Sequence, residues 1–265
     1  MDNNFNIPLE YLTDDEVAEL SKVVGRLEEV SKRDESQKDF MSFVKNVWPT
    51  FIEGSHHKIY ADKLQKVAEG KIKRLIVNMP PRHTKSEFAS YLFPSWLMGR
   101  KPDTKIIQAT HTAELAVGFG RKVKNLIDSD IYRDVFPDLA LASDAKASGR
   151  WSTSKGGEYY AVGVGGALAG RGADLCIIDD PVSEQDALSP TALDNIYEWY
   201  TSGPRQRLQP GGSIIIVMTR WSIRDLTAKV LAKQAEGGAD NWEVVEFPAI
   251  FPETDNVLWP EYWQR

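Results

Sequence analysis

The segment from Arg74 to Ser86, RLIVNMPPRHTKS, constrains the fold more than any other part of this chain. An apolar run leads into a turn with two prolines, and the turn ends in Lys85-Ser86 before a stretch of helical character. Strand, tight loop, Lys-Ser and helix is the layout of a nucleotide phosphate-binding loop, in which backbone N–H groups and the helix N-terminus face the phosphates. In such a loop the lysine reaches the β- and γ-phosphates and the serine hydroxyl ligates Mg²⁺.

The usual pattern, G-x-x-x-x-G-K-[ST], is incomplete here, because Met79 and Thr84 stand where the two glycines belong. The motif by itself is therefore also compatible with a strand, a turn and a helix whose lysine is merely exposed. The two prolines favour the phosphate-binding interpretation, because they fix φ and stiffen the loop. The residues expected to contact the nucleotide here are Pro80, Pro81, Arg82, His83, Thr84, Lys85 and Ser86.

A second apolar run, Leu175 to Ile178, ends in two adjacent carboxylates, Asp179 and Asp180, followed by Pro181. Acidic residues at the carboxyl end of a central strand lie where ligands bind in open α/β sheets. Two adjacent carboxylates also repel each other unless a cation shares the site. The alternative is an Asp-Asp-Pro turn without function, which the preceding Lys-Ser loop makes less favoured.

Strand-like runs alternate with helical patterns along the chain, and this alternation predicts an α/β fold with a parallel sheet. A polar stretch at 140–158 is expected to be a surface loop. Strands are expected at 74–79, 105–110, 159–164, 175–178, 213–218 and 243–250. Helices are expected at 13–32, 40–48, 57–68, after the loop up to a disturbance at Pro94, and at 115–127, 191–200 and 225–234.

Composition excludes several classes of protein. The 265 residues are 42% hydrophobic and 26% charged, which suits a globular protein of one large or two small domains. The aliphatic run near Ile214 to Val217 is too short to cross a bilayer, and residues 1–20 lack a secretory signal. Cys176 is expected in the core, and without a disulfide framework an intracellular compartment is expected. Zinc ligation is not expected, because the four histidines lack a metal-finger spacing: His56, His57, His83 and His111.

The three strand ends together resemble the large terminase subunit of tailed bacteriophages, the ATP-driven motor that moves double-stranded DNA into a procapsid. Proteins of this family often carry P-P-R-x-x-K-S in place of a glycine-rich loop, as in Pro80–Ser86. They carry G-R-G-A-D ahead of I-I-D-D-P, as in Gly170–Asp174 and Ile177–Pro181, and a T-R-W coupling motif, as in Thr219–Trp221. The resemblance is to the ATPase half of the family and covers about Val47 to Trp263.

The resemblance implies a P-loop NTPase fold of the ASCE/RecA-like class, with a mostly parallel central sheet flanked by helices. Residues 1–50 are expected to form an N-terminal helical adaptor region and residues 51–250 the ATPase core. Residues 251–265 are expected to be a linker toward a nuclease domain of RNase H-like fold that lies outside this chain. Nuclease activity is therefore not expected of these residues.

The resemblance and the site chemistry imply ATP hydrolysis coupled to DNA translocation. Lys85 would hold the β- and γ-phosphates, while Ser86 and Asp179 would hold Mg²⁺. Motor ATPases of this broad class usually carry glutamate after the Mg²⁺-linked aspartate, but this chain has Asp180, which is one methylene shorter. Either Asp180 or Glu184 one turn later positions the attacking water, and we favour Asp180.

Five further residues receive roles from the same resemblance. Arg82 would contact the γ-phosphate within its own subunit. Arg171, expected at the nucleotide edge of the sheet, would serve as a finger for a neighbouring subunit. His57, before the first strand, matches a nucleotide-binding region less specifically, while Thr219 and Arg220 would couple loss of the γ-phosphate to movement.

The implied cofactors are ATP and Mg²⁺. The implied partners are double-stranded DNA, the portal protein of the procapsid, the small terminase subunit and further copies of this chain in a ring, with a monomer as an option for the isolated chain and no membrane. The implied place is the host cytoplasm, and transiently the procapsid. The net charge of −6 requires any DNA-binding surface to be local or supplied by partners.

Three alternatives remain open. A helicase-like DNA-dependent ATPase would need a second RecA-like domain, for which the chain has no room. A catalytically weak nucleotide-binding scaffold would explain the missing glycines, but the retained Lys85, Ser86 and Asp179 speak against it. A small-molecule kinase would differ from a motor in that DNA would not stimulate its ATP turnover.

Overall fold

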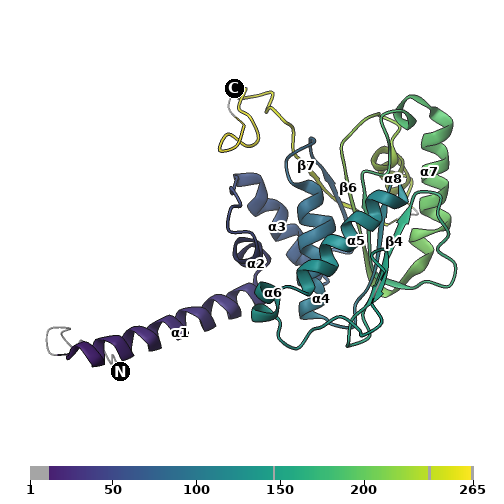
Figure 1. The fold of residues 1–265 in the computed structure, drawn as a ribbon. Coiled ribbons are helices and arrows are strands. Elements are labelled where there is room, and N and C mark those ends of the chain that lie inside the picture. The colour runs from purple at the N-terminus through teal and green to yellow at the C-terminus, as the bar shows by residue number, and fades with distance from the viewer. Residues whose placement is uncertain (1–11, 146, 238–239, 264–265) are drawn as a thin grey trace.

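The computed structural model describes residues 12–145, 147–237 and 240–263. Its seven strands form one sheet in the order β3-β4-β2-β5-β6-β1-β7, and every described pairing is parallel except that of β3 with β4. The predicted α/β fold, with a mostly parallel central sheet flanked by helices, is confirmed (Figure 1). The strands are β1 (Arg74–Asn78), β2 (Lys105–Thr110), β3 (Arg150–Ser152), β4 (Glu158–Gly163), β5 (Ala173–Asp179), β6 (Leu208–Met218) and β7 (Glu243–Glu246).

The central strands are buried on both faces, and this explains their continuous apolar runs. In β5, Leu175 and Ile177 face one core, whereas Cys176 and Ile178 face the other. Cys176 is a buried free thiol, as predicted. The first core lies under α2 to α6 and the second under α7 and α8.

In the described part of the chain no helix is both long and apolar enough to span a membrane.

Most of the longer helices lie where the sequence predicted them. The helical segments are α1 (Asp14–Lys38), α2 (Phe40–Val47), α3 (Ser55–Ala68), η2 (Glu87–Leu92), α4 (Phe93–Arg100), α5 (Ala113–Ile127), α6 (Asp130–Val135), η3 (Asp186–Leu188), α7 (Pro190–Ser202), η4 (Pro204–Arg207) and α8 (Leu226–Ala235).

Helix α1 begins at the predicted capping box and extends away from the body (Figure 1). The Thr13 hydroxyl accepts a bond from the Glu16 N–H, and the Glu16 carboxylate accepts one from the Thr13 N–H at 2.8 Å. The helix reaches the body near Ser36, whose carbonyl accepts a bond from the Trp96 indole at 2.9 Å. The helix is longer than the predicted 13–32, because its last turns pack on the body.

The helix after the loop from Pro80 to Ser86 has an irregular first part. Its first part, η2, is a π-helix, closed by a bond from the Phe93 N–H to the Phe88 carbonyl. A disturbance of the helix was expected at Pro94, and the π-turn ends at Leu92, shortly before it. The chain continues as a helix, because Pro94 lies in the first turn of α4, where proline is tolerated.

Four strands differ from the prediction by more than one residue: β5 and β6 begin earlier than expected, at Ala173 and Leu208, and β3 and β7 differ in other ways. The expected loop at 140–158 contains β3, in which the buried Trp151 stacks on Tyr159 with ring centroids 4.9 Å apart. Strand β7 ends at Glu246 rather than at residue 250, since Pro248 cannot donate to a sheet.

The division into adaptor, core and linker stays a prediction. Within the first section, Phe40 and Phe43 of α2 belong to the same core as the sheet. Within the last section, Leu258 belongs to that core as well, and Trp259 is buried.

Candidate active site

The carboxyl ends of β1, β5 and β6 bring the predicted loop and the predicted carboxylates together. The Lys85 ammonium lies 2.7 Å from the Asp180 carboxylate, and the lysine side chain is only 8% exposed. Strand β6 lies between β1 and β5, so this ion pair joins the segments that follow two strands that are not neighbours. The interpretation of Lys85 as a merely exposed side chain does not describe this structure.

The loop takes a backbone conformation that glycine normally supplies. Thr84 has φ of 66° and Arg82 has φ of 60°, both in the left-handed region that non-glycine residues rarely adopt. The missing second glycine of the motif is thus replaced by a threonine in a glycine-like conformation, which needs support from its surroundings.

His57 supplies part of that support. The Gly54 N–H donates to its Nδ1 at 2.8 Å, so its Nε2 carries the proton and donates to the Thr84 hydroxyl at 2.7 Å. That hydroxyl in turn donates to the His83 carbonyl at 2.6 Å. Burial, and then the charge of His56, lowers the pKa of His57 to about 3, so the ring is neutral at pH 7. His57 therefore reaches the loop through Thr84.

Tyr60 supports the next residue of the loop and was not predicted. Its hydroxyl donates to the Lys85 carbonyl at 2.9 Å, and its ring stacks on Phe88 with centroids 5.5 Å apart. Burial raises the pKa of Tyr60 well above its ordinary value, so the hydroxyl stays a donor. The sequence feature that could have indicated Tyr60 is its spacing of three residues from His57, which places both side chains on the same side of α3.

Asp179 is buried among hydroxyl donors. Ser86 donates to it at 2.9 Å and Ser90 at 2.7 Å, while the Gln108 amide donates to Ser90 at 3.0 Å. Burial and the adjacent Asp180 raise the pKa of Asp179 to about 7, although the serines and Lys85 oppose the shift. Ser90 was not predicted, but its spacing of four residues from Ser86 places both on one side of the turn.

The donor set at Asp179 fits Mg²⁺. The Ser86 hydroxyl and the Asp179 carboxylate are hard oxygen ligands, and Mg²⁺ usually takes one or two such ligands besides phosphate oxygens and waters. The described residues contain no group of three or more His, Cys, Asp or Glu side chains suited to a metal ion. A site completed by a nucleotide needs no such group.

The tip of β6 connects the two other strand ends. The Thr219 N–H donates to the Asp180 carboxylate at 2.7 Å, and the Thr219 hydroxyl contacts the Met79 carbonyl at 3.5 Å. Asp180 itself has φ of 41°, a third strained backbone position at this edge besides Arg82 and Thr84. Arg220 pairs with the buried Asp225 at 2.8 Å and reaches Glu246 at 3.5 Å.

Asp180 and Glu184 line one pocket of about 600 Å³, together with Trp221 and His111. Glu184 is exposed, whereas the Asp180 side chain is 29% exposed and held by Lys85. The choice between these two carboxylates as the group that positions water therefore stays a prediction.

The structure does not bring Arg171 to this cluster. We expected it at the nucleotide edge of the sheet, but β5 begins at Ala173 and reaches that edge only at Asp179. A connection between parallel strands must return to the amino edge before the next strand starts. The Arg171 guanidinium instead lies 4.6 Å from the Tyr160 ring centroid. Arg82 is exposed on the loop, and no ion pair to it is seen in the described part of the chain.

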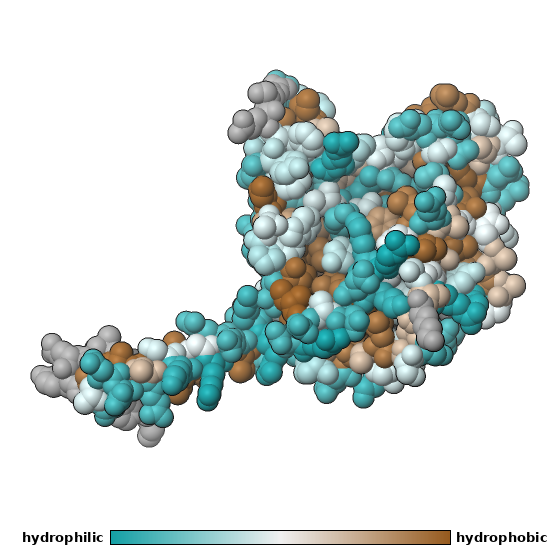
Figure 2. All heavy atoms as spheres, viewed as in Figure 1, coloured by the Kyte–Doolittle hydropathy of each residue, from teal (hydrophilic) through white to brown (hydrophobic). Residues whose placement is uncertain are grey.

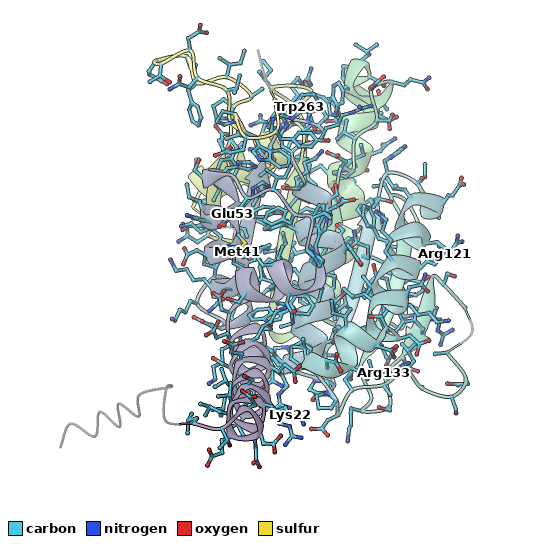
Figure 3. All side chains as sticks on the ribbon, turned by 60° about the vertical axis from the view of Figure 1, so that its left-hand side comes forward. Lys22, Met41, Glu53, Arg121, Arg133 and Trp263 are labelled. Atoms are coloured by element: carbon cyan, nitrogen blue, oxygen red, sulfur yellow. The ribbon has the colours of Figure 1, made fainter. Side chains whose placement is uncertain are left out.

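Aromatic residues near the C-terminus cover the loop on one side. Trp259 packs edge-on against His57 at 4.9 Å, and Trp263 stacks on His83 at 6.0 Å between ring centroids. His83 donates from Nδ1 to the Pro81 carbonyl at 2.8 Å. Figure 3 shows Trp263 at the end of the body opposite Lys22 of α1. The sequence had suggested only a linker here.

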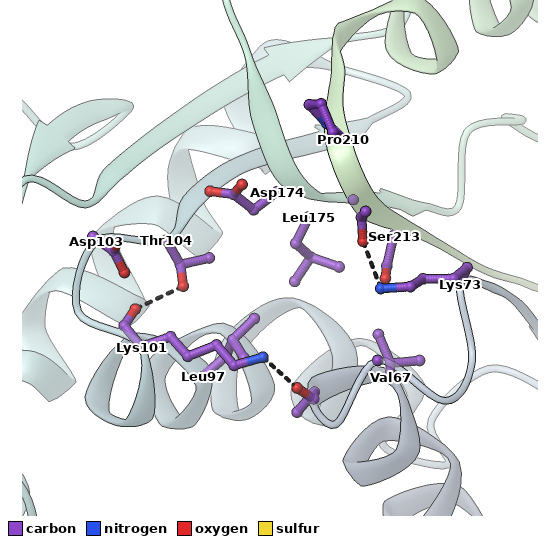
Figure 4. Close-up of a pocket in the computed structure, with 14 residues that line it drawn as sticks. Val67, Lys73, Leu97, Lys101, Asp103, Thr104, Asp174, Leu175, Pro210 and Ser213 are labelled. Atoms are coloured by element: carbon purple, nitrogen blue, oxygen red, sulfur yellow. Dashed lines mark hydrogen bonds between the residues drawn. The ribbon is translucent and has the colours of Figure 1, made fainter.

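A different pocket, of about 260 Å³, lies at the amino edge of the sheet (Figure 4). Lys73 donates to the Gly211 carbonyl and Lys101 to the Ala68 carbonyl, each at 2.6 Å. No residue predicted for nucleotide binding lines it.

No protein-family model and no curated protein matches the sequence of this chain. Among solved structures, the HK97 bacteriophage large terminase is similar with a TM-score of 0.50 and 12% identity, over 83% of this chain and 45% of that one. The large terminase of a thermophilic bacteriophage, in complex with ADP, gives a TM-score of 0.40 and 14% identity, over 70% and 44%. The chain thus spans less than half the length of either protein. The likeness to the HK97 protein shows a shared fold.

Proposed function

We propose that this chain is the ATPase part of a bacteriophage large terminase, which hydrolyses ATP to move double-stranded viral DNA into a procapsid. The observation that carries the proposal is the cluster of Lys85, Asp180, Asp179 and Ser86 at the carboxyl edge of the sheet, in which Lys85 and Asp179 are buried. The fold shared with the HK97 large terminase supports it. Phosphoryl transfer needs mainly positioning and charge neutralisation, and this cluster provides both.

Lys85 would hold the β- and γ-phosphates together with the N–H groups of the loop from Pro80 to Ser86. Bound phosphates would compete with Asp180 for the lysine ammonium, which lies 2.7 Å from that carboxylate. Ser86 and Asp179 would hold Mg²⁺, which neutralises charge on the phosphate oxygens when bound. Asp180, once released from Lys85, would orient the attacking water, with Glu184 as the alternative.

The coupling role belongs to the tip of β6. Thr219 contacts both the loop strand and Asp180, so a shift of either would move it. Arg220 would pass that shift to α8, because its partner Asp225 caps that helix by accepting from the Ala228 N–H at 3.1 Å.

Two arginines remain candidates for contact with the γ-phosphate. Arg82 would act within its own subunit, since it is exposed on the loop itself. Arg171 would act on the site of a neighbouring subunit, and a finger of this kind is worth about 10³–10⁵ in turnover. In assembled rings, Arg171→Ala mixed with Lys85→Ala should regain activity that neither variant has alone. Without recovery at any ratio, Arg205 or Arg207 becomes the better candidate.

The proposed partners are double-stranded DNA, the portal protein of the procapsid, the small terminase subunit and further copies of this chain in a ring, in the host cytoplasm. Because the net charge is −6, DNA binding by this chain alone should be weak and should fall steeply with salt.

The deciding experiment compares ATP turnover of the chain alone, with DNA, and with DNA plus the procapsid–portal complex. Stimulation that requires the portal complex supports the packaging motor. Stimulation by DNA alone would favour a helicase-like ATPase. ATP turnover that neither DNA nor the procapsid–portal complex changes would favour a kinase-like enzyme. Nucleotide binding without turnover would favour a scaffold.

A further inference from the structure

Helix α1 carries an apolar stripe that the other described residues leave uncovered. Its side chains are 37% to 63% exposed, and brown apolar atoms are visible along the projecting arm in Figure 2. A helix stripe of this width normally faces a core or a partner. The stripe consists of Val17, Leu20, Val23, Val24, Leu27 and Val30.

The apolar pattern of this stripe is the same in both chain directions. From Val17 to Val30 the sequence is VAELSKVVGRLEEV, which reads V-x-x-L-x-x-V-V-x-x-L-x-x-V forwards and backwards. We propose that α1 pairs with α1 of a second copy of this chain in an antiparallel arrangement. With the two-fold axis between residues 23 and 24, Leu20 is level with the partner's Leu27. The same self-complementary surface then serves both copies, as a two-fold contact requires.

Charge favours the antiparallel over the parallel arrangement. The first turn of α1, Asp14 to Glu16, is wholly acidic. Parallel pairing would bring two such turns, and two helix N-termini, side by side. Antiparallel pairing places each acidic turn level with the segment from Ser31 to Arg33 of the partner, which holds two basic residues and no acidic one. It also opposes the two helix dipoles.

The length of the arm leaves room for this pairing. In the proposed register Asp14, the first residue of α1, is level with the partner's Arg33. The amino end of each helix therefore stays short of the point near Ser36 where its partner enters the body. The stripe of 14 residues is about 20 Å long, and an interface of this size belongs to the small, reversible class. A two-fold contact uses the same surface on both copies, so it is limited to a pair and differs from the contact between neighbours in a ring. The proposal does not rest on the proposed ATPase function.

Sedimentation velocity over a range of concentrations of the full chain tests the pairing. The wild type should form a reversible dimer, and Leu20→Ala with Leu27→Ala should weaken it by about tenfold or more. The matched control is Lys22→Ala with Glu29→Ala, which has the same spacing on the far side of the helix and keeps the net charge. Circular dichroism checks that the wild type and each variant are folded. A wild type that stays monomeric, or a leucine variant that dimerises as the wild type does, would overturn the proposal.

Disulfide formation tests the orientation. Cys176 is the chain's single cysteine and is buried, so any cross-link between copies can be assigned to the introduced cysteines. Leu20→Cys and Leu27→Cys proteins should cross-link to each other when mixed, but not to themselves. Like positions in the antiparallel pair lie seven residues apart, about 10 Å along the axis, beyond the reach of a disulfide. Cross-linking of each variant with itself, or none in the mixture, would reject the antiparallel register.

Discussion

The two edges of the sheet use lysine in different ways. At the carboxyl edge Lys85 is paired with the carboxylate of Asp180, whereas at the amino edge Lys73 and Lys101 donate to backbone carbonyls. A carboxylate can be replaced by another anion, but a carbonyl at the end of a helix or turn fixes the chain in place. Lys85 is also buried, whereas Lys73 and Lys101 are exposed, so burial and an exchangeable partner together distinguish the lysine of the carboxyl edge.

Backbone strain separates the two edges as well. Of the four non-glycine residues with positive φ in the described chain, Arg82, Thr84 and Asp180 lie at the carboxyl edge. The backbone of these residues costs on the order of 1–3 kcal/mol each, and such strain clusters where a protein binds or reacts. The sheet therefore concentrates backbone strain at its carboxyl edge.

The largest contrast should come from replacing one lysine at each edge. Lys85→Ala should reduce ATP turnover by about 10³-fold or more, because the transferred charge loses its counter-ion. Lys101→Ala, which removes a lysine of the other edge, should leave turnover unchanged. A coupled phosphate-release assay measures both, with circular dichroism to confirm folding. Normal turnover in a folded Lys85→Ala protein would remove the basis for the phosphate-binding loop.

The next contrast lies within the carboxyl edge, between Asp180 and Glu184. Asp180→Asn should still bind ATP–Mg²⁺ but lose about 10²–10⁴ in turnover, because the amide cannot accept a proton or orient water equally well. Glu184→Gln should keep most activity. Binding of a fluorescent ATP analogue, measured beside turnover, separates affinity from chemistry. If only Glu184→Gln loses turnover, the roles are reversed.

Asp179 should make stability depend on pH. Its pKa in the folded protein is raised from 3.8 to about 7, so the folded state holds a proton that the unfolded chain releases. The raised pKa therefore makes the protein less stable as pH rises from about 4 to 7. Without nucleotide and Mg²⁺, Asp179→Asn should exceed the wild type in free energy of unfolding at pH 8 by about 4 kcal/mol at most. The difference should vanish near pH 4 in urea titrations. A variant less stable than the wild type at pH 8 would contradict this account.

The smallest effect concerns the missing glycine. Thr84→Gly and Thr84→Ala both remove the hydroxyl that His57 contacts, but only alanine keeps the strain at φ of 66°. Thr84→Gly should therefore be more stable than Thr84→Ala by about 1 kcal/mol, since relief of strain exceeds the entropy cost of glycine. Urea titration measures the difference. Equal stabilities would mean that the loop relaxes around alanine.

The sequence predicted best what is local. Strand β2 has the expected ends because its apolar run is bounded sharply, and the loop and the aspartates were found from short motifs. Strand β3 was missed because its stability depends on Trp151 stacking on Tyr159 across the sheet. The position of Trp263 over His83 likewise depends on contacts between distant segments, which no periodicity reveals.

Arg171 was misplaced for a different reason. Its distance from Asp179 along the chain was known, but the edge of the sheet on which it lies depends on the direction of β5. A strand of seven residues separates two positions that looked close in sequence.

The π-helical turn η2 has a consequence for how this chain can vary over generations. A π-turn holds one residue more than the α-helical turn it replaces. Ser90 within it reaches Asp179, while Phe93 and Trp96 beyond it lie in the core. Loss of one codon within Glu87–Leu92 would rotate α4 by about 100° relative to the loop. Either Ser90 would no longer reach Asp179, or Phe93 and Trp96 would no longer pack in the core. Descendants of this chain can exchange side chains in the turn, but its length must be inherited unchanged.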